Sequence, residues 1–478
     1  MTLRTGSWLL ATCIVMAAAG PAIKVVSSPP GSTSHEAIIS AGSARQFHLS
    51  GTASCSARAC HGGLEFDESP PSKRSYSTWL LHDKHRSAAR VLESERSREI
   101  ARRLQIKEPE AEERCLVCHS NPQLAVSARD DSRKVERAYG VGCEACHGAA
   151  SNWLEEHSKP AWKQKSLAEK RAAGMWVSPS SPRQDLVEAA RVCAGCHVGA
   201  PPKAPGGVAG EVTHELIAAG HPRLTFEFGA YLAWMPKHWA EAKDSTFEPR
   251  AWAVGQLASA ETILDLLAHR AETTPQAWPE FAEYDCFACH HDLHAAPRPA
   301  EHRDNASEPL AGSLPWGTWQ LAMVRHALAA QPGHEDALIL SGLDGLRAFL
   351  GEPRILTEAT RQRARAAAAK LRSAAQRLDR NGNFEDASMR GLAKTIANQG
   401  AARPEASWDE KAQRCLALVA LELGSGQRRP GAGPPRSEAS RALERILRFP
   451  PGYDSPRDAM DPSRLDGEVR ELFQQLGR

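Results

Sequence analysis

The sequence predicts a mainly α-helical protein, with short helices and long loops in its first part and an all-helical region at its C-terminal end. Apolar residues recur at helical spacing over 250–271, with Trp252 and Leu257 among them, which predicts an amphipathic helix there. After a segment rich in proline, serine and charged residues, the same spacing returns in five windows: 316–330, 335–350, 357–379, 407–423 and 437–449. Five short cysteine–histidine strings fill the stretch from Cys55 to His290, at fewer than 50 residues for each string.

These strings share one pattern, in which a histidine directly follows the second of two cysteines. Four of them separate the cysteines by two residues: Cys115–His119, Cys143–His147, Cys193–His197 and Cys286–His290. The first string, Cys55–His61, separates them by four and needs a looped-out backbone. A C-x-x-C-H run is typical of c-type haem attachment, in which both thiols bond to the haem and the imidazole binds its iron.

The sequence therefore predicts five covalently attached haem c groups. The predicted attachment residues are the motif cysteines Cys55, Cys60, Cys115, Cys118, Cys143, Cys146, Cys193, Cys196, Cys286 and Cys289. The predicted proximal iron ligands are the motif histidines His61, His119, His147, His197 and His290. No catalytic residue is assigned.

Zinc is the alternative cofactor, because pairs of C-x-x-C motifs also build zinc ribbons and knuckles. Zinc requires nothing of the residue after the second cysteine, whereas every string here has histidine at that position. Ten of the twelve cysteines belong to the strings, which leaves Cys13 and Cys415. The cysteine pattern thus indicates cofactor attachment and not a disulfide framework, and Cys415 is expected to be buried as a small apolar residue.

So little chain for each haem cannot enclose a separate conventional core, and we expect the porphyrins to serve as the apolar interior. The predicted architecture is a pentahaem cytochrome c domain over 48–300, in which short helices and long loops wrap around the haems. A linker over 301–315 and an all-helical domain over 316–478 follow it. Motifs two and three begin only 28 residues apart, which predicts that their haems are neighbours.

The N-terminus predicts export. Arg4, an apolar run over 8–19 and small residues near Gly20 form the layout of a signal peptide over 1–22, followed by a flexible spacer over 23–47. An uncleaved membrane anchor is the alternative. Haem c is attached outside the cytoplasm, so a periplasmic location agrees with the motifs. The formal net charge of +2, with basic residues interleaved among glutamates, gives no indication of nucleic-acid binding.

Fourteen histidines outside the motifs are available as sixth, distal iron ligands. His85 lies on an apolar stripe of a helix expected over 77–95, together with Leu81 and Leu92, and is the favoured ligand there. His82 on the neighbouring face is the second choice. A satisfied core histidine is the alternative interpretation of His85.

Four further histidines are candidate distal ligands. His157 follows Trp153 by four residues, at helical spacing, with a surface position as the alternative. His214 and His221 flank a short helix that is expected to end at Gly220. The remaining candidate is His238, which follows a Trp-Met-Pro sequence, while Met175 and Met235 are minor candidates.

The haem region resembles the multihaem cytochromes related to cytochrome c-554, the cytochrome c-552/4 domain family. The resemblance rests on 54–62, on 79–85, and on 142–148 with His157, and it extends over about 48–300. In that family the histidine after the first motif and the one after the C-E-x-C-H-G string are distal ligands, which implies these roles for His85 and His157. The family's usual members have four haems and a regular first motif, so haem order and partner are not carried over.

Electron transfer through a chain of mostly bis-histidine haems is the function that the sequence favours, with periplasmic or membrane-bound redox proteins as partners. The alternative is a haem oxidoreductase that acts on a small nitrogen or oxygen species at one open iron, with the widened first site, or any haem that lacks a partner, as the vacancy. His82 and Asp83 would then be its acid–base pair. A third possibility is a scaffold whose helical tail docks a larger redox complex. A small-molecule substrate is expected only if one iron is open.

Overall fold

The structure is a computed structural model of the 478-residue chain. The residues that it describes are 47–64, 70–123, 131–177, 185–203, 207–239, 246–273, 279–286, 316–317, 319–351, 357–382, 384–403, 406–425, 437–447 and 462–478. The predicted signal peptide and nearly all of the predicted spacer, together with the predicted linker over 301–315, lie outside these residues.

Helices account for the regular structure, which confirms the predicted mainly α class. The first half contains α1 Ser75–His82, α2 Glu95–Arg103, α3 Glu113–His119, α4 Asp131–Ala138, α5 Cys143–His147, α6 Pro160–Gln164, α7 Leu167–Ala172, α8 Leu186–His197, α9 His214–Ala219 and α10 Phe228–Trp234. The second half contains α11 Phe247–Thr273, α13 Val324–Ala329, α14 Asp336–Leu350, α15 Thr357–Asn381, α16 Asp386–Ala402, α17 Trp408–Ser425, α18 Glu438–Ile446 and α20 Pro462–Gly477. The extended pairings within the described ranges are two isolated bridges, Ala200–Gly210 and Tyr284–Trp316.

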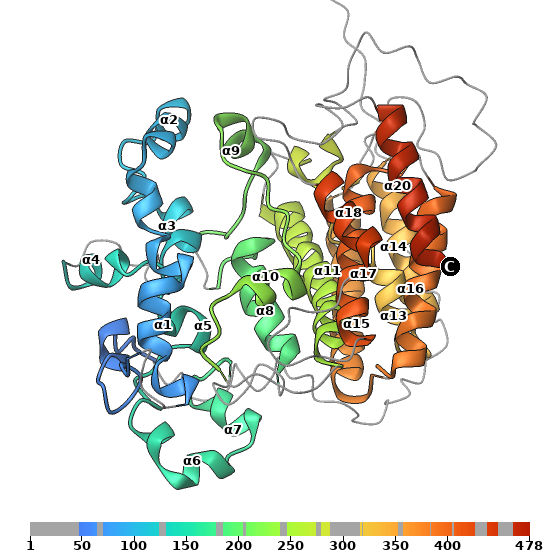
Figure 1. The fold of residues 1–478 in the computed structure, drawn as a ribbon. Coiled ribbons are helices and arrows are strands. Elements are labelled where there is room, and N and C mark those ends of the chain that lie inside the picture. Colours follow the sequence, from blue (N-terminus) through green and yellow to red (C-terminus); the bar gives the residue numbers. More distant parts are fainter. Residues whose placement is uncertain are drawn as a thin grey trace, which may run out of the picture. The chain divides into compact units, whose positions relative to one another are not determined.

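Helix α11 connects the two halves of the described chain. It contacts α8 and α10 on one side and α13, α15 and α17 on the other (Figure 1). Its side chains are therefore buried almost all round, and Trp252, Leu257 and Leu264 are completely inaccessible. The helix over 250–271 was correctly predicted, but its expected amphipathic character was wrong, because neighbours cover both sides of it.

The main apolar core draws on both sides of the 301–315 segment. It includes Leu186 and Phe226 from the first half and Leu371 and Phe473 from the second. A second, small cluster consists of Ala150, Trp153, Trp162 and Met175. Among the described residues, the region before α8 thus has few apolar side chains buried against one another, and the predicted domain boundaries stay a prediction.

The helix expected over 77–95 is interrupted. Helix α1 ends at His82, and 3-10 turns follow over Lys84–Ser87 (η4) and Arg90–Glu93 (η5). Asp83 has an extended backbone (φ −86°, ψ 126°), and its carboxylate accepts the backbone N–H of His85, which starts the new turn. Leu81 is 63% exposed, so the predicted apolar stripe is wrong as well.

Most of the predicted tail helices are confirmed as α14, α15, α17 and α18, whereas only 324–329 of the window over 316–330 is α-helical. Helices α16 and α20 were not predicted. Gly400 lies inside α16, where a Cβ atom would come within 2.9 Å of the Phe473 ring of α20. The glycine therefore permits close helix packing there. No helix within the described ranges is long and apolar enough to cross a membrane.

The fold makes a testable prediction about α11. We expect Leu264→Ala to lower the free energy of unfolding by about 2–5 kcal/mol, because the side chain is fully buried between helices and its removal leaves a cavity. The matched control is Leu338→Ala in α14, where the side chain is 56% exposed and a change within about 0.5 kcal/mol is expected. Denaturant unfolding followed by far-UV circular dichroism measures both, and equal losses would contradict the central position of α11.

Candidate haem sites

Three of the motifs occupy the last turns of helices. Helices α3, α5 and α8 each end at the motif histidine, His119, His147 or His197. Cysteines three residues apart on a helix share a face, and so both thiols of a motif point to the same side of the backbone. The described cysteines, which include nine of the ten motif cysteines and Cys415, form no disulfide.

The widened first motif folds as a looped turn after a short 3-10 helix over Thr52–Cys55. The carbonyl of Ala57 accepts the backbone N–H groups of Cys60, His61 and Gly62 at 2.8–3.1 Å. A Cβ atom at Gly62 would lie 1.9 Å from the Ser56 carbonyl oxygen, so the turn requires glycine there. The additional residues thus form a hydrogen-bonded turn and leave the His61 ring close to a second imidazole.

Each fully described motif histidine lies opposite one non-motif histidine. The pairs are His61 with His157, His197 with His85, His119 with His221, and His147 with His238. Their ring centroids are separated by 6.0, 5.9, 6.3 and 6.3 Å in the same order. The structure thereby brings four of the five candidate distal histidines together with a predicted proximal one.

This separation fits a metal ion between the rings. Two opposed imidazoles that bind one metal need ring centres about 6 Å apart, because each metal–nitrogen bond is about 2 Å long. Haem iron takes two axial ligands, since the porphyrin supplies the other four, whereas a structural zinc takes four protein ligands. Two facing imidazoles next to a pair of cysteines therefore suit haem c better than zinc.

Hydrogen bonds on the far side of the rings fix their orientation. The Nδ1 atoms of six histidines lie 2.6–3.3 Å from backbone carbonyls: His61 to Ser72, His119 to Ala88, His147 to Val177, His157 to Trp153, His221 to Pro222 and His238 to Pro236. A carbonyl oxygen only accepts, so Nδ1 must carry the proton. The lone pair then resides on Nε2, which is the tautomer that a metal at Nε2 requires.

Burial keeps several of these rings uncharged. It lowers the pKa of His147 and of His197 to about 4 each. Burial also lowers the pKa of His61, His221 and His238. A neutral imidazole offers a lone pair at neutral pH, which metal binding needs.

His85 differs from the other paired histidines in its hydrogen-bond partner. Its Nδ1 lies 2.9 Å from the Oδ1 atom of Asp83, a carboxylate that is 7% exposed. This hydrogen bond raises the pKa of His85. Burial acts to raise the pKa of Asp83, but the hydrogen bond and charge of His85 outweigh it, and the net shift is downward. The sequence pattern Asp-x-His is a signal for this pair that the sequence analysis missed.

Cysteines of different motifs are neighbours. The Cys55 thiol lies beside that of Cys143, and the Cys118 thiol lies beside that of Cys196. In the haem-bearing protein these atoms would be thioether sulfurs. The contacts join motif one to motif three and motif two to motif four, whereas sequence spacing had suggested motifs two and three as neighbours.

Glu144, the second residue of motif three, ties the first motif to the third. Its buried carboxylate accepts the backbone N–H groups of Ser50 and Gly51 at 2.9 and 2.8 Å, and that of Ala150 at 2.7 Å. The segment that leads into Cys55 is therefore held against α5. Three backbone donors on one buried carboxylate are a structural role that the motif pattern did not predict.

The fifth motif is described only at Cys286, since Cys289 and His290 lie outside the described residues. The candidate ligand His214 lies beside the segment that leads into this motif. Its backbone N–H donates to Glu280 at 2.7 Å, and its ring is 5.9 Å from that of Phe281. His214 thus lies beside the described segment over 279–286, which leads into the fifth motif.

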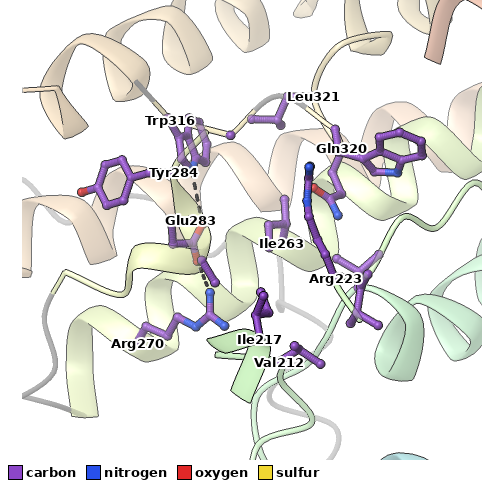
Figure 2. A pocket seen from close by; sticks show the side chains of 15 residues that line it. Val212, Ile217, Arg223, Ile263, Arg270, Glu283, Tyr284, Trp316, Gln320 and Leu321 are labelled. Carbon is purple, nitrogen blue, oxygen red and sulfur yellow. Dashed lines mark hydrogen bonds and ion pairs between the residues drawn. The ribbon is translucent and has the colours of Figure 1, made fainter. Parts of the chain in front are cut away.

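A pocket lies beside the same segment (Figure 2). It encloses about 630 Å³, part of it open to solvent, and is lined by Tyr284, Trp316 and residues of α9 and α11. Within it the Glu283 carboxylate accepts the Arg270 guanidinium at 2.5 Å and the Trp316 indole N–H at 3.2 Å (Figure 2). These buried bonds fix the chain three residues before Cys286 against α11.

The minor candidates have other surroundings. Met175 is 1% exposed and packs in the small cluster with Trp153 and Trp162. Met235 is half-buried and caps the C-terminus of α10. Under the alternative function, His82 and Asp83 were the expected acid–base pair. His82 is exposed, and the described hydrogen bonds of the Asp83 carboxylate are to His85.

Comparison with known proteins supports the same assignment. The family described as cytochrome c554 and c-prime matches residues 50–148, which contain the first three motifs and His85. No curated protein and no solved structure shows a significant match to the chain. The predicted resemblance is confirmed for this segment, while its expected extent to about residue 300 goes beyond the match. The chain is therefore a c-type cytochrome with covalently bound haem that resembles the cytochrome c554 and c-prime family over residues 50–148.

Proposed function

We propose that this cytochrome transfers electrons through five covalently attached haems, at least four of which have two histidine ligands. The observation that carries the proposal is the set of four imidazole pairs with ring centroids 5.9–6.3 Å apart. Haem c supplies one-electron iron chemistry at such a site, and two histidines favour a lower potential than histidine with methionine.

The protein's own residues orient and enclose the proposed sites. Hydrogen bonds at Nδ1 hold each described distal ring in one tautomer, and the cysteine contacts between motifs bring attachment points of different haems together. Adjacent attachment points support electron exchange between neighbouring cofactors. For the fifth site we propose His290 as proximal ligand and His214 as distal ligand, because His214 lies beside the segment before Cys286.

The alternative function, reduction or oxidation of a small nitrogen or oxygen species, requires an iron with a free position. The widened first motif was the expected vacancy. His157 lies opposite His61 there, which favours an occupied sixth position. Electron transfer is therefore the better supported function.

We further propose a periplasmic location and redox proteins of the periplasm or membrane as partners. The signal-peptide layout of residues 1–22 supports export, with an uncleaved N-terminal anchor as the alternative. Covalent haem attachment agrees with this location.

Haem stoichiometry tests the number of sites. We expect five haems per chain by pyridine haemochrome assay and four after the double substitution Cys55→Ser and Cys60→Ser, because the widened motif would lose both of its thioether bonds. The control Cys415→Ala removes a buried cysteine outside the motifs and should leave five. Four haems in the unmodified chain, with none lost in the double variant, would contradict haem attachment at the first motif.

Substitution of a distal histidine tests the ligand pairs. His221→Ala removes one imidazole and leaves His119 in place, so about one fifth of the iron should become high-spin and bind carbon monoxide. Low-temperature electron paramagnetic resonance and carbon monoxide titration measure this change. His334→Ala, at an exposed position in the tail, should retain the original spectrum. A low-spin spectrum that His221→Ala leaves unchanged would mean that His221 does not bind iron.

A further inference from the structure

Asp83 is a buried carboxylate that hydrogen-bonds to His85, a candidate iron ligand of the four histidine pairs. Its Oδ1 atom accepts both the backbone N–H and the Nδ1–H of His85, each at 2.9 Å. The residue lies where α1 ends and η4 begins, with 7% of its surface exposed. Two hydrogen bonds to one oxygen fix the carboxylate and the ring relative to each other.

The other rings with a described Nδ1 partner donate to neutral backbone carbonyls. His85 alone among these seven rings donates to a carboxylate. The Asp83 charge also acts on His238 and Cys146 of the third site, but the hydrogen bond described for this carboxylate to a paired ring is that to His85, and this bond distinguishes the pair His85–His197 from the other three. That difference is electrostatic, because the lengths of the hydrogen bonds are similar.

A carboxylate that accepts the Nδ1 proton increases the electron density at Nε2. A more basic ligand stabilises ferric iron more than ferrous iron, and burial strengthens the effect because the surroundings screen the charge poorly. An opposing charge is also present. The Lys203 ammonium lies 4.3 Å from the centroid of the Trp176 ring and interacts electrostatically with the Cys146 and Cys196 thiols. Among the described hydrogen bonds, none joins Lys203 to a paired histidine.

We propose that Asp83 is a positioning residue that orients His85 and lowers the reduction potential of the haem attached at Cys193 and Cys196. This inference rests on the proposed bis-histidine sites. It adds a functional difference between them: the fourth motif's haem is tuned by a charge that the other three described pairs do not have on their Nδ1 atoms. Electrons would therefore reside at that haem less readily than they would without Asp83.

Asp83→Asn tests the inference, because asparagine removes the charge and keeps a carbonyl oxygen that accepts the Nδ1 proton, while its NH2 group replaces the second carboxylate oxygen. In a spectroelectrochemical titration of the holo-protein, we expect one component, equal to one haem, to move furthest to higher potential. The haem at Cys143 and Cys146 should move less, because Asp83 acts on His238 and Cys146 without a described hydrogen bond to them, and the other components, the haem count and the low-spin spectrum should stay unchanged. Asp83→Ala should move the same component and also broaden its low-spin resonance signal, since the ring loses its anchor.

The matched control is Asp185→Asn, which removes a buried carboxylate that pairs with Arg171 and contacts no paired histidine. It should leave every component in place. Unchanged potentials in Asp83→Asn, with haem count and low-spin signals intact, would overturn the role of Asp83 and leave the proposed function standing. A holo-protein without low-spin haem would instead overturn both, and equal shifts in Asp83→Asn and Asp185→Asn would show an unspecific charge effect and also overturn the proposal.

Discussion

The proposed axial ligation of iron by facing histidines is the constraint on which the first half of this structure depends. Each pair of facing imidazoles has ring centroids 5.9–6.3 Å apart, although its members are separated by 91 to 112 positions in the sequence. Joining such distant segments costs chain entropy, and the cost must be offset by the interactions that form. A metal bound between two imidazoles provides a strong interaction for this purpose, and metal binding of this kind couples to folding.

The distribution of buried side chains agrees with that dependence. The main apolar core begins at α8 and continues through α11 into the tail helices, whereas the cluster before α8 contains four buried side chains. Local hydrogen bonds supply further order in the first half. Glu144 accepts the backbone N–H of Gly51, which precedes motif one, and that of Ala150, which follows motif three. Asp83 redirects the chain so that His85 comes to lie opposite His197. The two parts of the described chain are thus stabilised in different ways.

Much of this could be predicted from the sequence, because motif spacing carries direct chemical information. Cysteines three residues apart followed by histidine predict the attachment points, and Gly220 closes α9 in the left-handed conformation (φ 118°) as expected. Long-range pairing was beyond sequence reasoning, since nothing local assigns His221 to His119 or His238 to His147. Local polar contacts also overrode the periodicity, as the interruption at Asp83 demonstrates.

The tail helices show a second limit of prediction from the sequence. Gly400 has low intrinsic helix propensity, yet it lies within α16 because the Phe473 ring packs against its backbone. The unpredicted α20 supplies that ring, so the two missed helices depend on each other. Sequence periodicity was informative where apolar residues were frequent, as in α14 and α17, and failed where a glycine had a packing role.

The central claim is that one iron lies between the two imidazoles of each pair. Anomalous diffraction from a crystal of the holo-protein, measured at the iron absorption edge, tests it most directly. We expect an iron peak midway between the two rings of each pair: His61 with His157, His85 with His197, His119 with His221, and His147 with His238. Iron peaks with a different residue in the sixth position, or histidine pairs with no metal between them, would contradict it.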